Sequence, residues 1–177
     1  MVGIESGSNE MKRFVVTGCN GYIGSHMCYE LKKAYPDCVI HGIDKNEKQH
    51  LRSLYDIFSH IDLALDPIIL SPFVREPIDA VFHFAALTSV EEGEMRPFQY
   101  FDNNVTGSMR LIREALKSQV SNFIFSSTAA VYGERKDCLF GHLGENLDMN
   151  AFSVYGKTKQ MVEEVLATIT DMNVMCL

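Results

Sequence analysis

The stretch "VVTGCNGYIGSH", residues 15–26, decides the fold of this chain. It starts as a β-branched run and passes through Gly18, Gly21 and Gly24 into a segment with apolar residues at helical spacing. Gly18 permits a tight turn, Gly21 leaves no side chain in the way of a diphosphate, and Gly24 lets the helix pack closely against the strand. The amino end of such a helix offers free N–H groups and a positive dipole end to phosphates. The motif therefore predicts a dinucleotide-binding turn.

An acidic residue closes the second expected strand. "CVIHGID", residues 38–44, ends on Asp44, twenty residues after Gly24. A carboxylate at this place binds the hydroxyls of an adenosine ribose. It also repels a 2′-phosphate, which favours NAD over NADP, but the next residue, Lys45, has the opposite charge. We expect NAD as the cofactor.

Strand and helix patterns alternate along the rest of the chain. This alternation predicts an α/β fold, a Rossmann-type doubly wound parallel sheet with right-handed crossovers. Three prolines within residues 64–79 argue against a long helix there. The expected strands span 13–18, 38–44, 79–86, 122–127 and 173–177; the expected helices span 22–35, 47–62 (running into a short strand near Ile61), 102–119 and 154–169, with a long loop at 134–153.

The composition excludes several classes of protein. The 177 residues, 46% hydrophobic and 22% charged, suit a globular domain, and the net charge of −7 argues against binding to nucleic acid or to an anionic membrane. No apolar run is long enough to span a bilayer and no signal peptide is recognisable, so we expect a cytoplasmic protein. The cysteines lack metal-ligand spacing, so we assign no metal and no disulfide: Cys19, Cys28, Cys38, Cys138 and Cys176.

A candidate reacting group lies in "VYGKTK", residues 154–159, where Tyr155 and Lys159 are four apart on one helix face. An ammonium beside a phenol lowers the phenol pKa towards a range useful for proton transfer. Thr128 follows an expected strand and can donate a hydrogen bond to a substrate oxygen, or else cap the strand end. Ligands collect at the carboxyl ends of strands in open α/β sheets. One crevice should therefore be lined by Gly18, Ala85, Ala86 and Thr128.

Five segments resemble, in order and nearly in spacing, those of the extended short-chain dehydrogenase/reductases, and within them the UDP-glucose 4-epimerases. Related sugar-nucleotide dehydratases usually carry Asp-Glu after the threonine, and Ala129 and Ala130 stand there instead. The resemblance is therefore to an epimerase and not to a dehydratase. The segments are "VTGCNGYIGSH" (16–26), "IDAVFHFAALTSV" (78–90), "YFDNNVTGSMRLI" (100–112), "NFIFSSTAAVYG" (122–133) and "YGKTKQMVEEVL" (155–166).

The resemblance implies a set of cofactor contacts and a catalytic group. The NAD-binding residues would be Gly18, Gly21, Tyr22 and Ile23 at the pyrophosphate, Gly24 in the packing of the loop, Asp44 at the ribose, Asp62 and Leu63 at the adenine, Phe84, Ala85, Ala86 and Thr88 along the cofactor, and Asn103 in support. The catalytic residues would be Thr128, Tyr155 and Lys159, of which the last two also contact the cofactor.

The implied reaction interconverts UDP-glucose and UDP-galactose. A tyrosinate at Tyr155 takes the proton of the sugar 4-hydroxyl while hydride passes from that carbon to NAD, and the 4-keto sugar turns over and receives hydride on its other face. Lys159 would tune the tyrosine and bind the nicotinamide ribose. Family members usually carry a lysine where this chain has Thr88, so the resemblance implies weaker retention of NAD.

The resemblance also implies a shortened enzyme. We expect a polar leader at 1–11 and an NAD-binding domain at 12–177, without the following domain that binds the sugar nucleotide. Because remote parts of a substrate position the reacting carbon, activity should then be impaired or lost. The alternatives are a non-catalytic NAD-binding module or another NAD-dependent reductase or epimerase of sugar nucleotides. A homodimer through "MRLI" and "MVEEVL" is a further expectation.

Overall fold

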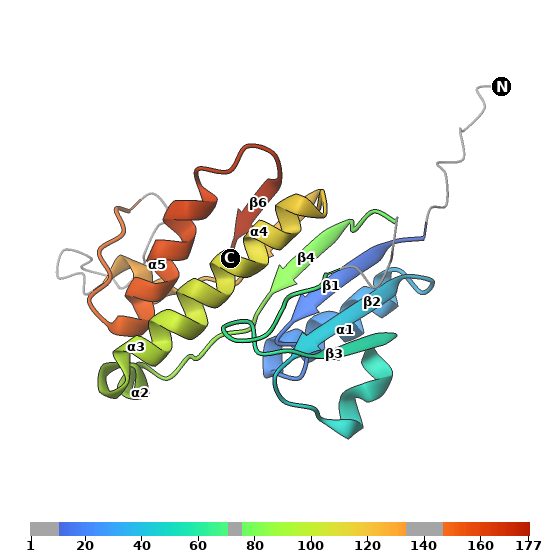
Figure 1. Ribbon diagram of the computed structural model, residues 1–177, viewed down its shortest axis with the longest axis horizontal. Helices are drawn as coiled ribbons and strands as arrows, with labels where there is room; N and C mark the ends of the chain where they lie inside the picture. Colours follow the sequence, from blue (N-terminus) through green and yellow to red (C-terminus); the bar gives the residue numbers. More distant parts are fainter. Residues whose placement is uncertain (1–10, 71–75, 134–146) are drawn as a thin grey trace.

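In the computed structural model, which describes residues 11–70, 76–133 and 147–177, six strands form one parallel sheet (Figure 1). Each strand is hydrogen-bonded to its neighbours in the order β3-β2-β1-β4-β5-β6. The chain therefore starts in the middle of the sheet, adds strands on one side, and returns to add strands on the other. The strands are β1 (Arg13–Thr17), β2 (Val39–Asp44), β3 (Ile57–His60), β4 (Ala80–His83), β5 (Asn122–Phe125) and β6 (Asn173–Cys176).

Helices cover both faces of the sheet. The α-helices are α1 (Tyr22–Ala34), α2 (Val90–Met95), α3 (Pro97–Tyr100), α4 (Gly107–Lys117) and α5 (Val154–Leu166). Two 3₁₀ turns, η1 (Gln49–Leu54) and η3 (Ala129–Tyr132), and a π-helical turn, η2 (Phe101–Thr106), complete the set. This arrangement is the Rossmann-type doubly wound fold that the sequence predicts, so that prediction is confirmed.

Alternation along β1 builds two separate cores. Val15 packs into a cluster with Leu111 of α4 and Val162 of α5, whereas Phe14 and Val16 pack on the other face with the α1 side chains. A strand sends successive side chains to opposite faces, so one strand anchors both helical layers. Figure 1 shows α4 and α5 on one face, with α1 behind the sheet.

The segment between β2 and β4 differs from the sequence-based expectation. In place of the expected helix, residues 49–54 form the short turn η1, and the strand expected near Ile61 is β3, which already begins at Ile57. Asp56 is the physical cause, because its backbone N–H donates to Ile40 O at 2.9 Å and its carboxylate accepts from Ile40 N at 2.8 Å. Lys32 of α1 also binds this carboxylate, at 2.7 Å. Pairing with β2 therefore replaces the local helical preference.

Two short helices precede α4 where the sequence assigned none. Ser89 caps α2, since its hydroxyl accepts from Glu92 N at 3.2 Å, and Pro97 occupies the first turn of α3. The helix expected at 102–119 therefore continues a helical path that begins earlier. The expected leader at 1–11 lies almost wholly outside the described residues, as do Cys138 and most of the expected loop at 134–153.

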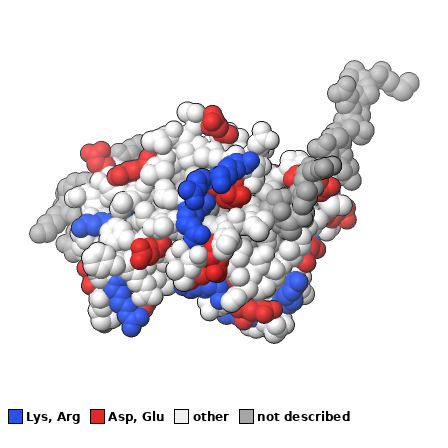
Figure 2. Space-filling model, viewed as in Figure 1, with Lys and Arg blue, Asp and Glu red and all other residues white. Residues whose placement is uncertain are grey.

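On the face in Figure 2, basic side chains are interspersed with acidic ones and form no broad basic area among the described residues. The net charge of −7 agrees with this picture. No helix in the described ranges is long and apolar enough to cross a membrane.

Candidate cofactor-binding and active site

The glycine loop between β1 and α1 is shaped by three different steric demands. Gly18 has a φ of +70°, and a Cβ there would lie 2.7 Å from Ala85 N. A Cβ on Gly24 would lie 2.1 Å from Gly18 O, so the helix can approach the loop only because this residue has no side chain. Gly21 is the N-cap of α1, and a Cβ there would meet only Gly18 O, at 3.1 Å.

The amino end of α1 has no side-chain cap. The N–H groups of its first turn have no partner within the helix. These groups fit an anionic diphosphate, which the helix dipole also favours.

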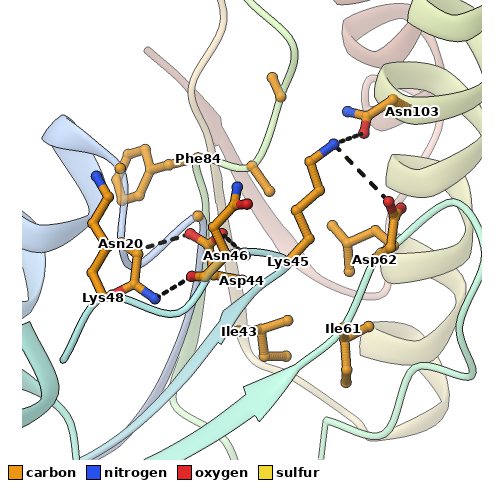
Figure 3. A pocket seen from close by; sticks show the side chains of 15 residues that line it. Asn20, Ile43, Asp44, Lys45, Asn46, Lys48, Ile61, Asp62, Phe84 and Asn103 are labelled. Carbon is orange, nitrogen blue, oxygen red and sulfur yellow. Dashed lines mark hydrogen bonds and ion pairs between the residues drawn. The ribbon is translucent and has the colours of Figure 1, made fainter.

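A cavity of about 210 Å³ opens at the carboxyl edge of the sheet, beside the glycine loop (Figure 3). It lies where the strand order reverses between β1 and β4, which is where open α/β sheets bind ligands. Nine of the predicted cofactor residues line it: Gly18, Gly21, Asp44, Asp62, Leu63, Phe84, Ala85, Ala86 and Asn103. Asn20, Lys45 and Lys48 line it too; the sequence singled out Lys45 as the basic neighbour of Asp44, but not Asn20 or Lys48.

Asp44 is fixed at the edge of this cavity by two backbone amides. Asn20 N donates to one carboxylate oxygen at 3.0 Å, and Asn46 N donates to the other at 2.9 Å. The Asn20 side chain holds the same turn, since its Nδ2 donates to Asn46 O at 2.6 Å and its Oδ1 accepts from Tyr55 Oη at 3.1 Å. Each oxygen of Asp44 keeps acceptor capacity for a ribose hydroxyl. The sequence signal that could have identified Asn20 is its position as a polar residue inside the glycine loop.

The other predicted residues lie outside the cavity lining. Tyr22 and Ile23 are exposed on the first turn of α1, and Gly24 is buried in the packing of that helix against the loop. Thr88 follows β4 without lining the cavity. The predicted catalytic residues also lie beyond it.

Those catalytic residues cluster around the end of β5. The side chains of Tyr155 and Thr128 hydrogen-bond to each other, and Thr128 Oγ1 also accepts from Ala130 N at 3.2 Å. Thr128 is therefore both a cap of η3 and a partner of the tyrosine. Burial raises the pKa of Tyr155, and the hydrogen bond from Thr128 opposes this rise.

Lys159 does not act on Tyr155 in the way the sequence suggested. Its Nζ donates to Ser126 O at 2.7 Å and lies 4.6 Å from the centre of the Phe125 ring. The side chain is almost fully buried, and burial lowers the pKa of Lys159 to about 8, against the attraction of Glu163. The pKa of Tyr155 is raised and not lowered, because burial outweighs the hydrogen bond with Thr128.

Asn104 joins the cofactor side of the site to the helix that carries Tyr155. Its Nδ2 donates to Leu87 O at 2.9 Å and to Thr158 Oγ1 at 3.1 Å, and its Oδ1 accepts from Leu87 N at 2.8 Å. Thr158 Oγ1 in turn donates to Tyr155 O at 2.7 Å. Sequence reasoning identified only its neighbour Asn103. The two residues belong to a π-helical turn, which the hydrophobic periodicity of the sequence does not reveal.

We expect Asn104→Ala to lower the free energy of unfolding by about 2–4 kcal/mol. The change leaves Leu87 N–H and C=O without their side-chain partners. Asn103→Ala is the matched control: Asn103 lies one residue away, is less buried, and should cost less than about 1 kcal/mol. Urea unfolding measures both, and equal losses would contradict the assignment.

His83 forms a second buried chain of hydrogen bonds. Its Nδ1 lies 2.7 Å from Thr17 Oγ1, and its Nε2 lies 2.7 Å from Ser108 Oγ. Ser108 Oγ donates to Asn104 O, so it must accept from His83 Nε2–H, and Thr17 then donates to Nδ1. The network therefore holds a neutral imidazole with its proton on Nε2.

This imidazole makes stability depend on pH. Burial, together with the smaller effect of the Lys159 charge, lowers the pKa of His83 to about 3. The unfolded chain takes up the proton near the ordinary value of 6.5, so stability should be lost as the pH falls from about 6.5 to about 3, by up to about 1.4 kcal/mol per unit. Burial also lowers the pKa of His41, in the same direction.

Urea unfolding of the wild type and of His83→Gln across this pH range measures the effect. The variant should show a shallower loss, whereas His50→Gln, at an exposed histidine, should keep the wild-type slope. An unchanged slope in His83→Gln would refute the prediction.

Comparison with known proteins identifies a family that matches most of this chain. The NAD dependent epimerase/dehydratase family matches residues 14–177. A UDP-glucose 4-epimerase of Yersinia pestis is 33% identical over 162 residues, which are 88% of this chain and 47% of that protein. The chain spans about half the length of the curated relatives it matches.

Solved structures agree in fold. A UDP-glucose-4-epimerase from Stenotrophomonas maltophila with bound NAD and formylated UDP-arabinopyranose superposes with a TM-score of 0.81 at 33% identity, covering 93% of this chain and 52% of that one. A UDP-glucose 4-epimerase from Brucella ovis in complex with NAD has a TM-score of 0.81 at 27% identity, with 93% and 50% covered.

Proposed function

Because this chain belongs to the NAD dependent epimerase/dehydratase family, we propose that it is the cofactor-binding part of an enzyme that interconverts UDP-glucose and UDP-galactose. The observation that carries the proposal is that one parallel sheet holds both parts of the site. The glycine-loop cavity follows β1, and Thr128, the partner of Tyr155, follows β5. Fold alone would not support an activity, since unrelated chemistry occurs on the same fold.

NAD is the cofactor of this family, and the residues present fit it. The first-turn amides of α1 would hold the diphosphate, Asp44 the adenosine ribose, and Asp62 and Leu63 the adenine. The chemistry that NAD supplies when bound is reversible transfer of a hydride. We propose residues 12–177 as the unit that binds it.

Tyr155 would take and return the proton of the sugar 4-hydroxyl at its Oη. Its raised pKa keeps the phenol protonated at neutral pH, so a nearby positive charge must favour the phenolate. Lys159 is one helical turn away and can supply that charge if its ammonium leaves Ser126 O. When the sugar is bound, Thr128 would donate its single hydroxyl hydrogen to the sugar oxygen in place of the phenol.

A non-catalytic NAD-binding module is the second candidate. The observation that favours it is that the Lys159 ammonium donates to Ser126 O while burial raises the pKa of Tyr155, so the phenol is not prepared to take a proton. Action on another sugar nucleotide, as a reductase or epimerase, is a weaker alternative.

Turnover of UDP-galactose to UDP-glucose by the purified chain, together with its NAD content after extraction, separates these candidates. Turnover with bound NAD supports the epimerase, and NAD without turnover supports the binding module. A chain that binds no NAD would overturn both.

We also propose that the chain forms a homodimer through α4 and α5. Within "MRLI", Leu111 and Ile112 are buried in the core and cannot be anchors, which corrects that part of the expectation. Leu116 of α4 and Met161 and Val165 of α5 are more than a third exposed and are available instead. Light scattering would measure the mass, and a monomer at all concentrations would refute this assembly.

A further inference from the structure

Two lysines line the cavity directly after Asp44. Lys45 and Lys48 come from the turn that follows β2, and Figure 3 shows their side chains on either side of Asp44 and Asn46. A basic side chain close to the strand-end acid is the feature with which dinucleotide-binding folds accommodate a 2′-phosphate. The reaction proposed above uses neither lysine.

Both ammonium groups are held weakly. Lys45 Nζ donates to Asn103 Oδ1 at 3.3 Å and lies 4.0 Å from Asp62 Oδ2, which are long distances for a hydrogen bond and an ion pair (Figure 3). Both lysines are exposed, and within the described ranges the structure records no hydrogen bond or ion pair for the Lys48 ammonium. Exposed contacts of this kind add little stability, so either lysine can turn to a new anion at small cost.

The acid beside them is less repulsive than its charge suggests. Both oxygens of Asp44 already accept a backbone N–H, from Asn20 and Asn46. Hydrogen bonds to a carboxylate spread and stabilise its charge. The two lysines also offset the two carboxylates, Asp44 and Asp62, that line the same cavity. These four are the charged residues that line the cavity, so its lining carries no excess of negative charge against a 2′-phosphate.

We infer that Lys45 and Lys48 allow the adenosine end of the cavity to accept a 2′-phosphate, so that the chain binds NADP as well as NAD. A phosphate monoester carries roughly two negative charges at neutral pH, which two point charges on flexible stems can neutralise from both sides. The inference depends on the proposed function only in that a dinucleotide occupies this cavity.

Calorimetric titration of the chain with NAD and with NADP tests the inference. We expect the Kd for NADP to lie within about tenfold of the Kd for NAD, and to rise more steeply with salt. 2′,5′-ADP and 5′-AMP serve as short probes that isolate the adenosine end. The double variant Lys45→Gln/Lys48→Gln should lose about tenfold more affinity for NADP than for NAD.

Lys33→Gln is the matched control, because Lys33 is an exposed lysine of α1 outside the cavity lining, paired with Glu30. It should change neither affinity. Binding of NAD without measurable binding of NADP would overturn the inference and leave the proposed function standing. Binding of neither cofactor would overturn both the inference and the proposed function. If Lys33→Gln lost as much affinity for NADP as the double variant, the effect would come from the overall charge of the chain, and the inference would also be overturned.

Discussion

Tyr155→Phe is expected to lower hydride transfer between a UDP-sugar and the bound cofactor by about 100-fold to 10,000-fold. The phenol Oη is the group that would move the proton of the sugar hydroxyl, and phenylalanine keeps the ring but has no proton to exchange. The fold should survive, since the change removes one hydrogen bond, to Thr128, and costs about 1 kcal/mol. NAD affinity should stay within a few fold.

Single-turnover reduction of the bound cofactor on adding UDP-galactose measures this effect even where steady-state turnover is slow. Tyr29→Phe makes the same change at an exposed tyrosine of α1 and should leave the rate unaltered. A Tyr155→Phe chain that keeps more than about a tenth of the wild-type rate would remove Tyr155 from the catalytic role.

Gly24→Ala is expected to cost about 3 kcal/mol or more of unfolding free energy. The added Cβ would stand 2.1 Å from Gly18 O and 2.7 Å from Gly18 C, and both atoms belong to the backbone. Neither can move like a side chain, so α1 must shift away from the loop. NAD binding should fall with the fold, because the first-turn amides shift with α1. Urea unfolding and calorimetry measure the two losses.

Gly21→Ala separates binding from folding. Its Cβ would meet only Gly18 O, at 3.1 Å, and its φ of −75° suits alanine, so stability should drop by less than about 1 kcal/mol. The methyl group would stand where the diphosphate approaches α1, so NAD affinity should fall by about tenfold or more. Equal stability losses in Gly21→Ala and Gly24→Ala would contradict the distinct roles of the two glycines.

The sequence predicted those parts of the site whose geometry depends on residues that are close together in the chain. The turn through Gly18, the amino end of α1 and the acid at the end of β2 each follow from a local pattern, and the structure places them around one cavity. Of the helix and short strand expected at 47–62, the strand is present as β3, but the helix was wrong, because Asp56 pairs with β2 across the sheet. No local pattern contains that contact.

Distance along the chain explains the other omissions. Asn104 contacts Leu87 and Thr158, which lie 17 and 54 residues away. The orientation of Lys159 towards Ser126 O is likewise a contact over 33 residues. Such pairs carry no periodic signal, and only the packed structure reveals them.

The sequence by itself determined the doubly wound sheet and the dinucleotide-binding loop, because alternating strand and helix patterns and glycine spacing act through residues that are neighbours in the chain. Only the tertiary structure decided the raised pKa of Tyr155, the direction of the Lys159 ammonium and the position of Lys45 beside Asp62 and Asn103. These properties depend on burial and on charges brought together from distant segments, and burial is a consequence of packing.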